Sequence, residues 1–177
     1  TNNFTFLVAV MLSAQSTDKK VNEITPNLFN KADSPEKMVQ LSVDEIKKII
    51  RQIGLAPTKA KNIRRMSELL ISKHKGLVPS SFSYLEELPG VGHKTASVIM
   101  SQAFNQPAFP VDTHIHRLAY RWGLSNGKNV IQTEKDLKEK FDKKIWNKLH
   151  LQIIFYGREF CQAKKTECLC RICQSVK

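Results

Sequence analysis

Apolar residues recur at helical spacing along most of the chain. The recurrence of every third or fourth residue holds over four separate runs, Val43–Ile53, Ile63–Leu70, Ala96–Ala103 and Ile115–Trp122. This spacing gathers apolar side chains on one face of an α-helix. A strand would instead alternate apolar and polar residues, and no segment does so convincingly. The pattern predicts an all-α fold.

Start and stop signals divide these helices from one another. Gly54 follows one predicted helix, Pro57 opens the next and Gly76 ends it, while Asp112 stands immediately before another. A further long helix is predicted over 146–160, where Trp146, Leu149, Ile153, Tyr156 and Phe160 are spaced by three and four. It leads directly into the cysteine-rich end of the chain.

The segment Asn105–Val111 is the best candidate for a crossing between two lobes. It contains Pro107 and Pro110, and proline resists continuation of a helix. A chain of 177 residues is long enough for one large domain or two small lobes, with a core that needs no disulfides. We expect a first helical lobe over residues 1–107 and a second over 108–177.

The charge balance points to a polyanionic partner. Lys and Arg number 28 against 16 Asp and Glu, which gives a net charge of +12. A basic protein that only avoids self-association is the alternative. The apolar run Phe6–Leu12 is too short to span a bilayer, and no charged leader precedes a cleavage-like site. These features predict an intracellular protein, cytoplasmic or nucleoid-associated and not secreted.

Four cysteines lie within the last 17 residues, at Cys161, Cys168, Cys170 and Cys173. A disulfide framework would distribute its cysteines along the chain to join distant segments. Four thiolates so close in sequence favour a metal site instead. The ligand set suits an iron–sulfur cluster or a tetrahedral zinc ion.

The segment Leu88-Pro89-Gly90-Val91-Gly92 predicts a tight turn between a short helix and the helical run from His93. Glycine permits positive φ angles, and proline fixes one φ. Without bulky side chains, the backbone N–H groups at the start of the following helix can approach an anion such as a DNA phosphate. An ordinary glycine-containing connection between helices is the alternative.

Lys94 falls in the first turn of the helix that follows this segment. The positive end of the helix dipole disfavours the ammonium form there, and only a neutral lysine amine is a nucleophile. Helical periodicity alone explains Lys94 equally well as part of a solvated polar stripe with Ser97 and Ser101. The residue pattern leaves both interpretations open.

Three separated motifs together resemble one known family. MLSAQSTD (Met11–Asp18), LPGVGHKTA (Leu88–Ala96) and VDTH (Val111–His114) occur in the order found in endonuclease III of the helix-hairpin-helix glycosylase superfamily. The resemblance implies a six-helix barrel beside a second helical lobe, with DNA in the cleft between them. It also implies that Lys94 is the Schiff-base nucleophile. The adenine-excising and 8-oxoguanine-excising relatives are weaker matches.

Asp112 has a structural and a catalytic interpretation. Its position before a helical run predicts an N-cap, and a capping carboxylate stays ionised. The resemblance assigns it a catalytic role, which a fixed anion can fill by stabilising an oxocarbenium-like sugar or by assisting proton transfer. The choice between general base and electrostatic stabiliser stays open.

Other DNA contacts follow from the resemblance. An enzyme that extrudes a nucleotide must fill the gap with side chains, and Gln15 and Leu55 match the gap-filling positions, although by pattern alone Gln15 reads as surface and Leu55 as core. Asp18 and His114 match cleft positions. The remaining expected DNA-binding residues are Leu88, Gly90, Val91 and Gly92 in the hairpin, and Lys164 and Lys165 as phosphate contacts.

The cysteine spacing departs from the family pattern. The family binds a [4Fe–4S] cluster through cysteines with gaps of six, two and five residues, whereas the gaps here are six, one and two. We expect the cluster, with zinc or an incomplete, empty site as alternatives.

The resemblance implies a bifunctional DNA glycosylase and AP lyase. Such an enzyme removes oxidised pyrimidines from duplex DNA through a Lys94 Schiff base and cleaves the abasic site by β-elimination. The expected partner is damaged double-stranded DNA, bound by a monomer away from any membrane. The alternatives are a monofunctional glycosylase, against which Lys94 argues, and a non-catalytic helix-hairpin-helix DNA-binding module.

Overall fold

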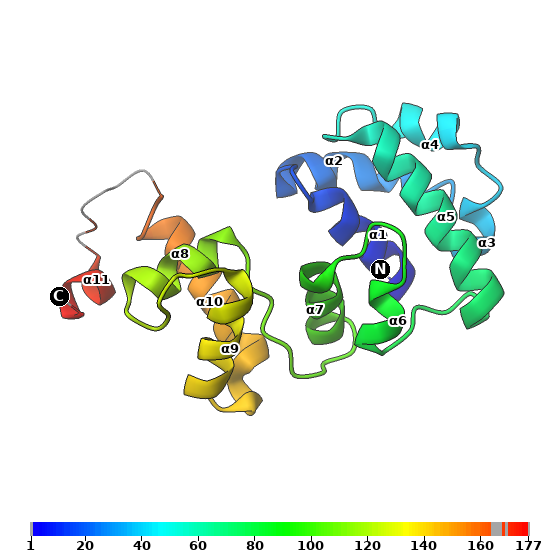
Figure 1. Ribbon diagram of the computed structural model, residues 1–177. Helices are drawn as coiled ribbons and strands as arrows, with labels where there is room; N and C mark the ends of the chain where they lie inside the picture. The colour runs from blue at the N-terminus through cyan, green and yellow to red at the C-terminus, as the bar shows by residue number, and fades with distance from the viewer. Residues whose placement is uncertain (1, 164–167, 169, 177) are drawn as a thin grey trace. The chain divides into compact units, whose positions relative to one another are not determined.

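The computed structural model describes residues 2–163, Cys168 and 170–176, and this part of the chain contains helices and no β-strand (Figure 1). The predicted all-α class is confirmed. In chain order the helices are α1 (Asn3–Ser13), α2 (Asp18–Phe29), α3 (Pro35–Met38), α4 (Val43–Ile49), α5 (Ala56–His74), α6 (Phe82–Glu86), α7 (His93–Gln102), α8 (Thr113–Arg121), α9 (Val130–Lys140), the 3₁₀ turn η1 (Lys143–Ile145), α10 (Trp146–Glu159) and α11 (Arg171–Ser175).

The chain folds as two compact units, Thr1–Ile99 and Met100–Lys177. The first contains α1 to α6 and most of α7, and the second contains the end of α7 and the helices that follow. The predicted lobe boundary after residue 107 stays a prediction. Every helix among the described residues is too short or too polar to cross a membrane.

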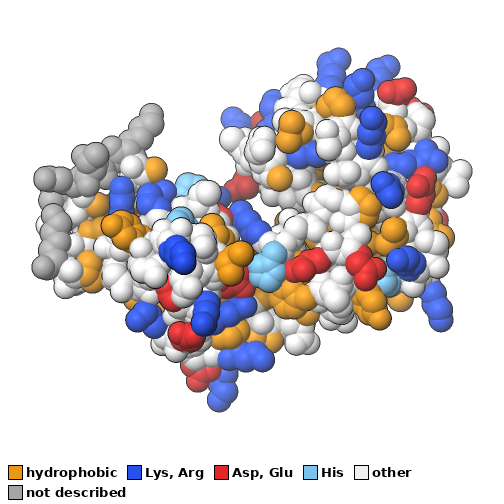
Figure 2. All heavy atoms as spheres, viewed as in Figure 1, with side chains coloured by type: hydrophobic (Ala, Val, Ile, Leu, Met, Phe, Trp, Pro, Cys, Tyr) orange, Lys and Arg blue, Asp and Glu red, His pale blue; other side chains and the backbone are white. Residues whose placement is uncertain are grey.

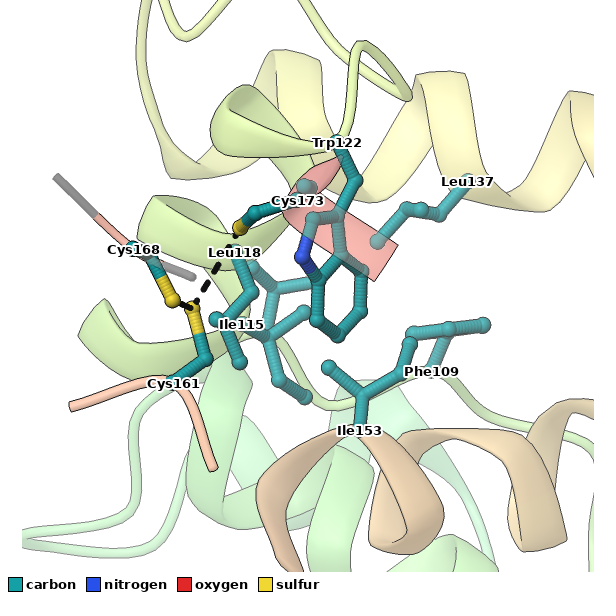
Figure 3. Close-up of a cluster of buried hydrophobic side chains, with 11 residues drawn as sticks. Phe109, Ile115, Leu118, Trp122, Leu137, Ile153, Cys161, Cys168 and Cys173 are labelled. Carbon is teal, nitrogen blue, oxygen red and sulfur yellow. Dashed lines mark hydrogen bonds between the residues drawn. The ribbon is translucent and has the colours of Figure 1, made fainter. Parts of the chain in front are cut away.

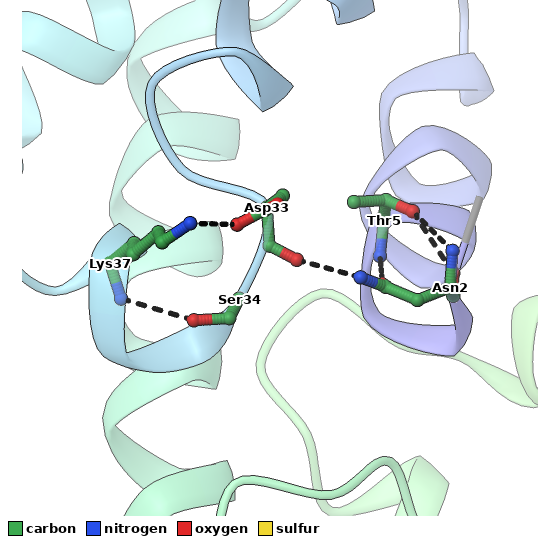
Figure 4. A network of polar contacts seen from close by, with 5 residues as sticks. All are labelled: Asn2, Thr5, Asp33, Ser34 and Lys37. Carbon is green, nitrogen blue, oxygen red and sulfur yellow. Dashed lines mark hydrogen bonds and ion pairs between the residues drawn. The ribbon is translucent and has the colours of Figure 1, made fainter.

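Helix α1 is central to the first unit. Its sequence is almost entirely apolar, and Leu7, Val8 and Leu12 are fully buried. Burying a side chain of this kind stabilises the fold by about 1.5–3 kcal/mol. Asn2 caps the helix, accepting from the Thr5 N–H at 2.8 Å, and its Nδ2 donates to Asp33 O at 2.9 Å (Figure 4). This bond ties the start of α1 to the loop before α3.

Helix α5 is the long amphipathic helix of the same unit and packs against α1, α3 and α4. Its buried face includes Ile63, Met66 and Leu70. It ends as the glycine signal predicts, because Gly76 adopts a φ of +75° directly after the left-handed C-cap. Helix α5 therefore contributes one long face of the core of the first unit.

The core of the second unit lies between α8, α9 and α10, and α8 packs against both of the other helices. Figure 3 shows Phe109, Leu118, Trp122 and Ile153 pointing into this core. The cysteines lie at one edge of the same cluster. The predicted helix over 146–160 is confirmed, since α10 spans Trp146–Glu159. It delivers the chain to the cysteine segment.

Candidate active site and cysteine site

The glycine-rich turn before α7 is anchored by apolar side chains and by close backbone packing. Leu88 and Val91 are buried, and the Val91 N–H donates to Leu88 O at 3.0 Å. Gly90 has a φ of +83°, and a Cβ there would lie 2.8 Å from both Asn62 Nδ2 and Met11 Cε. The positive φ favours glycine here, and the close approach of Asn62 and Met11 places the turn against α5 and α1.

Gly92 differs from Gly90 because its surroundings are open. A Cβ at this position would meet nothing within 4 Å, and Gly92, His93 and Lys94 are all exposed. The Gly92 carbonyl accepts from the Ala96 N–H at 2.9 Å, so α7 starts immediately after it. An exposed helix start with free space beside the backbone suits an anionic ligand.

Lys94 lies in the first turn of α7 with an exposed side chain. The alternative of a solvated polar stripe is wrong, because Ser97 and Ser101 on the same face are only 0% and 4% exposed. His93 is held beside the turn, with its Nδ1 2.7 Å from Glu86 Oε1 and its ring stacked on Phe82. Of the three polar residues Lys94, Ser97 and Ser101, Lys94 is the exposed one.

Asp112 is the N-cap of α8, as the sequence predicts. Its Oδ1 accepts from the Ile115 N–H at 2.8 Å, and its side chain is half-buried. His114 follows in the first turn and is exposed, with its Nδ1 3.5 Å from Arg117 Nη1. Asp112 belongs to the second unit and Lys94 to the first.

Gln15 and Leu55 lie on two neighbouring turns of the first unit. Both are exposed, and both have left-handed backbones, with φ of +55° and +61°. The turns touch at Gly54, where a Cβ would lie 2.9 Å from Gln15 O, and the Gly54 N–H donates to Ser16 Oγ at 3.3 Å. Leu55 is 55% exposed, so the pattern-based interpretation of it as core is wrong. Asp18 is exposed in the first turn of α2.

Lys59 is a candidate that sequence reasoning missed. It is only 7% exposed, and its Nζ donates to Leu12 O at 2.9 Å and to Ala14 O. Burial lowers the pKa of Lys59. A signal was present in the sequence, because Lys59 occupies the apolar face of α5 between Ala56 and Ile63. A lysine at such a position indicates a buried amine with a specific partner.

The four cysteine thiols converge. Their Sγ atoms all lie within 4.8 Å of one another, with Cys161 3.3 Å from Cys168 and 3.7 Å from Cys173. Cys170 is half-buried and the other three are buried. These four residues can hold a metal ion.

The thiol environments differ. For Cys170 burial acts to raise the pKa, but hydrogen bonds, chiefly with the Cys173 backbone and the Tyr156 side chain, lower it to about 6. Burial, reinforced by the neighbouring thiols, raises the pKa of Cys173 to about 12. A metal ligand must be a thiolate, so metal binding at this site would release protons from the thiols.

Two arginines of α8 fasten the cysteine segment to the second unit. Arg117 Nη2 donates to Cys161 O at 3.0 Å, and Arg121 Nη1 lies 3.5 Å from Cys161 Sγ and donates to Gln162 O at 3.1 Å. Lys164 and Lys165, the predicted phosphate contacts, lie outside the described residues. On the face of the molecule that Figure 2 shows, each unit carries Lys and Arg side chains.

The sequence and the fold both match known DNA repair proteins. Residues 8–143 match the family described as HhH-GPD superfamily base excision DNA repair protein. Endonuclease III of Rickettsia felis is 45% identical over 167 residues, which cover 94% of this chain and 78% of that protein. The chain therefore belongs to the endonuclease III family of this superfamily, which confirms the resemblance found in the motifs.

Two solved structures share the fold closely. A non-covalent endonuclease III–DNA complex matches with a TM-score of 0.95 at 40% identity, and the match covers 100% of this chain and 84% of the chain in that structure. A trapped endonuclease III–DNA covalent intermediate, an estranged-adenine complex, matches with a TM-score of 0.92 at 40% identity, and the match covers 99% of this chain and 86% of the chain in that structure.

Proposed function

We propose that this protein is a bifunctional DNA glycosylase and AP lyase that removes oxidised pyrimidines from duplex DNA. The observation that carries the proposal is the lysine presented on the open, glycine-flanked start of α7, in a chain whose relatives include a protein trapped covalently on DNA. The net charge of +12 fits a duplex partner. We expect the monomer to be the active form.

Lys94 acts as the nucleophile in this proposal. Its neutral amine attacks C1′ of the damaged nucleotide, and the C1′–N bond breaks with its electron pair leaving on the base, which takes up a proton. Opening of the sugar and loss of protons from the amine give an imine between Lys94 and C1′. The imine then stabilises the carbanion left when a C2′ proton is removed, and the C3′–O bond breaks to release the 3′ phosphate.

Asp112 supplies the fixed negative charge in this proposal. The Ile115 N–H bond holds one of its oxygens, and the carboxylate stays ionised as a helix cap. A carboxylate in that state stabilises positive charge developing on the sugar as the base departs, or accepts a proton from the attacking amine. Base excision then depends on the charge of Asp112 separately from its structural role.

The remaining predicted residues contact the DNA in our proposal. Gln15 and Leu55 fill the gap left by the extruded nucleotide, because both project from exposed turns that touch each other. The hairpin Leu88–Gly92 presents backbone N–H groups to a phosphate. Asp18 and His114 complete the binding surface. The lobes that carry these residues are proposed as 1–107 and 108–177.

We propose a [4Fe–4S] cluster on Cys161, Cys168, Cys170 and Cys173. The donor set fits, because four thiolates converge at the edge of a buried core. The cluster would contribute stability rather than a chemical step. A single zinc ion is the second candidate, favoured by the short sulfur separations: thiolates at about 2.3 Å from one tetrahedral ion lie closer together than those around a four-iron cube.

A borohydride trapping assay on a lesion-containing duplex tests the catalytic proposal. The wild type should form one reducible protein–DNA cross-link per site and nick the strand. Lys94→Gln should abolish both while the far-UV circular dichroism and nonspecific duplex binding stay intact. Lys94→Arg keeps the charge but offers no amine nucleophile. A binding module would tolerate arginine, and a monofunctional glycosylase would release base without a cross-link. Normal trapping by Lys94→Gln would refute the assignment.

Metal analysis of the purified protein tests the cysteine proposal. The cluster predicts iron, acid-labile sulfide and broad visible absorption, all lost in Cys161→Ser. Stoichiometric zinc in a colourless protein would select the second candidate. Protein containing neither metal would contradict both.

A further inference from the structure

We propose that Lys59 is a positioning residue that holds the Gln15 and Leu55 turns together in the shape needed to fill the gap in the duplex. The inference rests on the function proposed above. Lys59 does not reach the DNA in this role, because its side chain is buried and its amine points to backbone carbonyls of the protein. It acts only through the two turns.

Lys59 is bonded to both turns at once. Its Nζ donates to Leu12 O at 2.9 Å and to Ala14 O, the carbonyl directly before Gln15. Its backbone N–H donates to Leu55 O at 3.0 Å. The bond to Leu55 is the first backbone bond of α5, which any residue except proline makes, so only the Nζ bonds are specific to lysine. The Lys59 side chain thus joins the end of α1 to the first turn of α5, with the bonded carbonyl directly before Gln15 on one side and that of Leu55 itself on the other.

The turns need such a support because both gap-filling residues are strained. Left-handed backbone is disfavoured for residues other than glycine, and it persists only where the surroundings enforce it. Gln15 and Leu55 are two of four such non-glycine residues among the described positions. Neither has a buried side chain to hold it, so the constraint must come from the backbone bonds around them.

The charge of Lys59 suits the atoms it binds. The last carbonyls of a helix carry partial negative charge, and a cation placed there is stabilised. Helix α1 has no basic residue of its own in its last turn, so Lys59 supplies that cation from α5. An apolar side chain would fill the same space without fixing the two carbonyls. Hydrophobic packing alone would allow methionine at this position, so the role of the buried lysine is to fix the positions of the two carbonyls.

Two duplexes separate positioning from general stability. In the first the lesion faces a normal base, which must be supported when the lesion leaves the stack. In the second the lesion faces an abasic-site analogue, so that there is no base to support. We expect Lys59→Met to slow single-turnover base release on the first duplex by roughly tenfold to a hundredfold, and on the second by far less.

Lys61→Met is the matched control. Lys61 is exposed on the same helix, so the substitution removes an equal charge two residues away. It should leave both rates near the wild type. Circular dichroism and borohydride trapping on the second duplex report whether Lys59→Met is folded and chemically competent.

A second perturbation approaches the turns without touching Lys59. Gly54 does not have a positive φ, but a Cβ there would press on Gln15 O, a backbone atom that cannot rotate away. Gly54→Ala should therefore reproduce the selective loss on the first duplex. If Lys59→Met does not fold, Lys59→Gln, which keeps a donor but loses the charge and one chain atom, takes its place on both duplexes; normal base release by a folded Lys59→Gln on the first duplex would overturn the proposal.

A double-mutant cycle completes the design. In the background Gln15→Ala with Leu55→Ala, the further change Lys59→Met should have little additional effect on the first duplex, because its targets are already gone. Equal slowing on both duplexes, full additivity in the cycle, or unchanged rates in a folded Lys59→Met would each overturn the proposal. The proposed function fails separately, if the wild type itself forms no borohydride adduct.

Discussion

Substitutions can separate the structural role of Asp112, as the N-cap of α8, from its proposed catalytic role. Its Oδ1 caps α8 through the Ile115 N–H at 2.8 Å, and removal of such a cap costs about 1 kcal/mol. In a chain of this size that loss lowers Tm by about 2–4 °C. Asp112→Asn keeps an oxygen acceptor, so Tm should stay within about 1–2 °C of the wild type. Asp112→Ala should show the full decrease.

The activity of these variants should follow charge and not stability. Loss of one electrostatic stabiliser slows the chemical step by about 10²- to 10³-fold, and both Asp112→Asn and Asp112→Ala lose it. Single-turnover base release measures this step, with thermal unfolding followed in parallel. Lesion-duplex binding should persist in Asp112→Asn.

Asn129→Ala is the matched control for the cap. Asn129 caps α9 in the same unit by accepting from the Gln132 N–H at 2.8 Å. It should lower Tm as much as Asp112→Ala does while base release stays normal. If Asp112→Asn released base at the wild-type rate, or if Asn129→Ala slowed release to the same extent, the catalytic role of the Asp112 charge would be rejected.

Three other predictions follow from the geometry. Gly90→Ala should destabilise the fold by about 1–3 kcal/mol and weaken duplex binding, because it adds strain at a φ of +83° and a clash with Asn62; Gly92→Ala, which meets open space, is the control in denaturant unfolding. Burial lowers the pKa of His150, so neutral His150 contributes stability above pH 6.5, the ordinary His pKa, and this stability is lost as the pH falls below 6.5. The Tm of His150→Gln should therefore decline less than that of the wild type over this pH range, and an equal decline would contradict the role given to His150. Affinity for an abasic-analogue duplex should fall steeply with salt, and a flat dependence measured by fluorescence anisotropy would rule out binding through phosphates.

Helices with a regular apolar face could be predicted from the sequence, and others could not. The pattern predicted α5, α8 and α10 because their buried residues repeat every three or four positions. Helix α9 is mostly polar, and its buried residues are Leu137 and the polar Thr133 and Glu134, so its apolar periodicity is weak. Helix α2 contains Pro26, a residue that signals a helix end when read locally. Tertiary packing overrides both signals.

The residues of the candidate site could be predicted from the sequence, but the residues that hold them in position could not. Motifs carried Lys94, Asp112, Gln15 and Leu55 through the family resemblance. The function of Lys59 depends on contacts 45 and 47 residues away in sequence, which no local pattern encodes. The burial of Ser97 likewise depends on the surroundings of α7 and not on its own period. Long-range contacts are where single-sequence reasoning has least information.

Helix α8 links the cysteine site to the carboxylate of Asp112. Its nine residues, about 14 Å of helix, follow the cap Asp112 and include Arg117 and the last residue Arg121, both bonded to the Cys161 segment. A metal held by the thiolates would bind the folded unit and add its binding free energy to the stability of this helix. Oxidation of the thiols removes that contribution. We therefore expect oxidation of the C-terminal thiols to weaken the unit in which α8 holds Asp112.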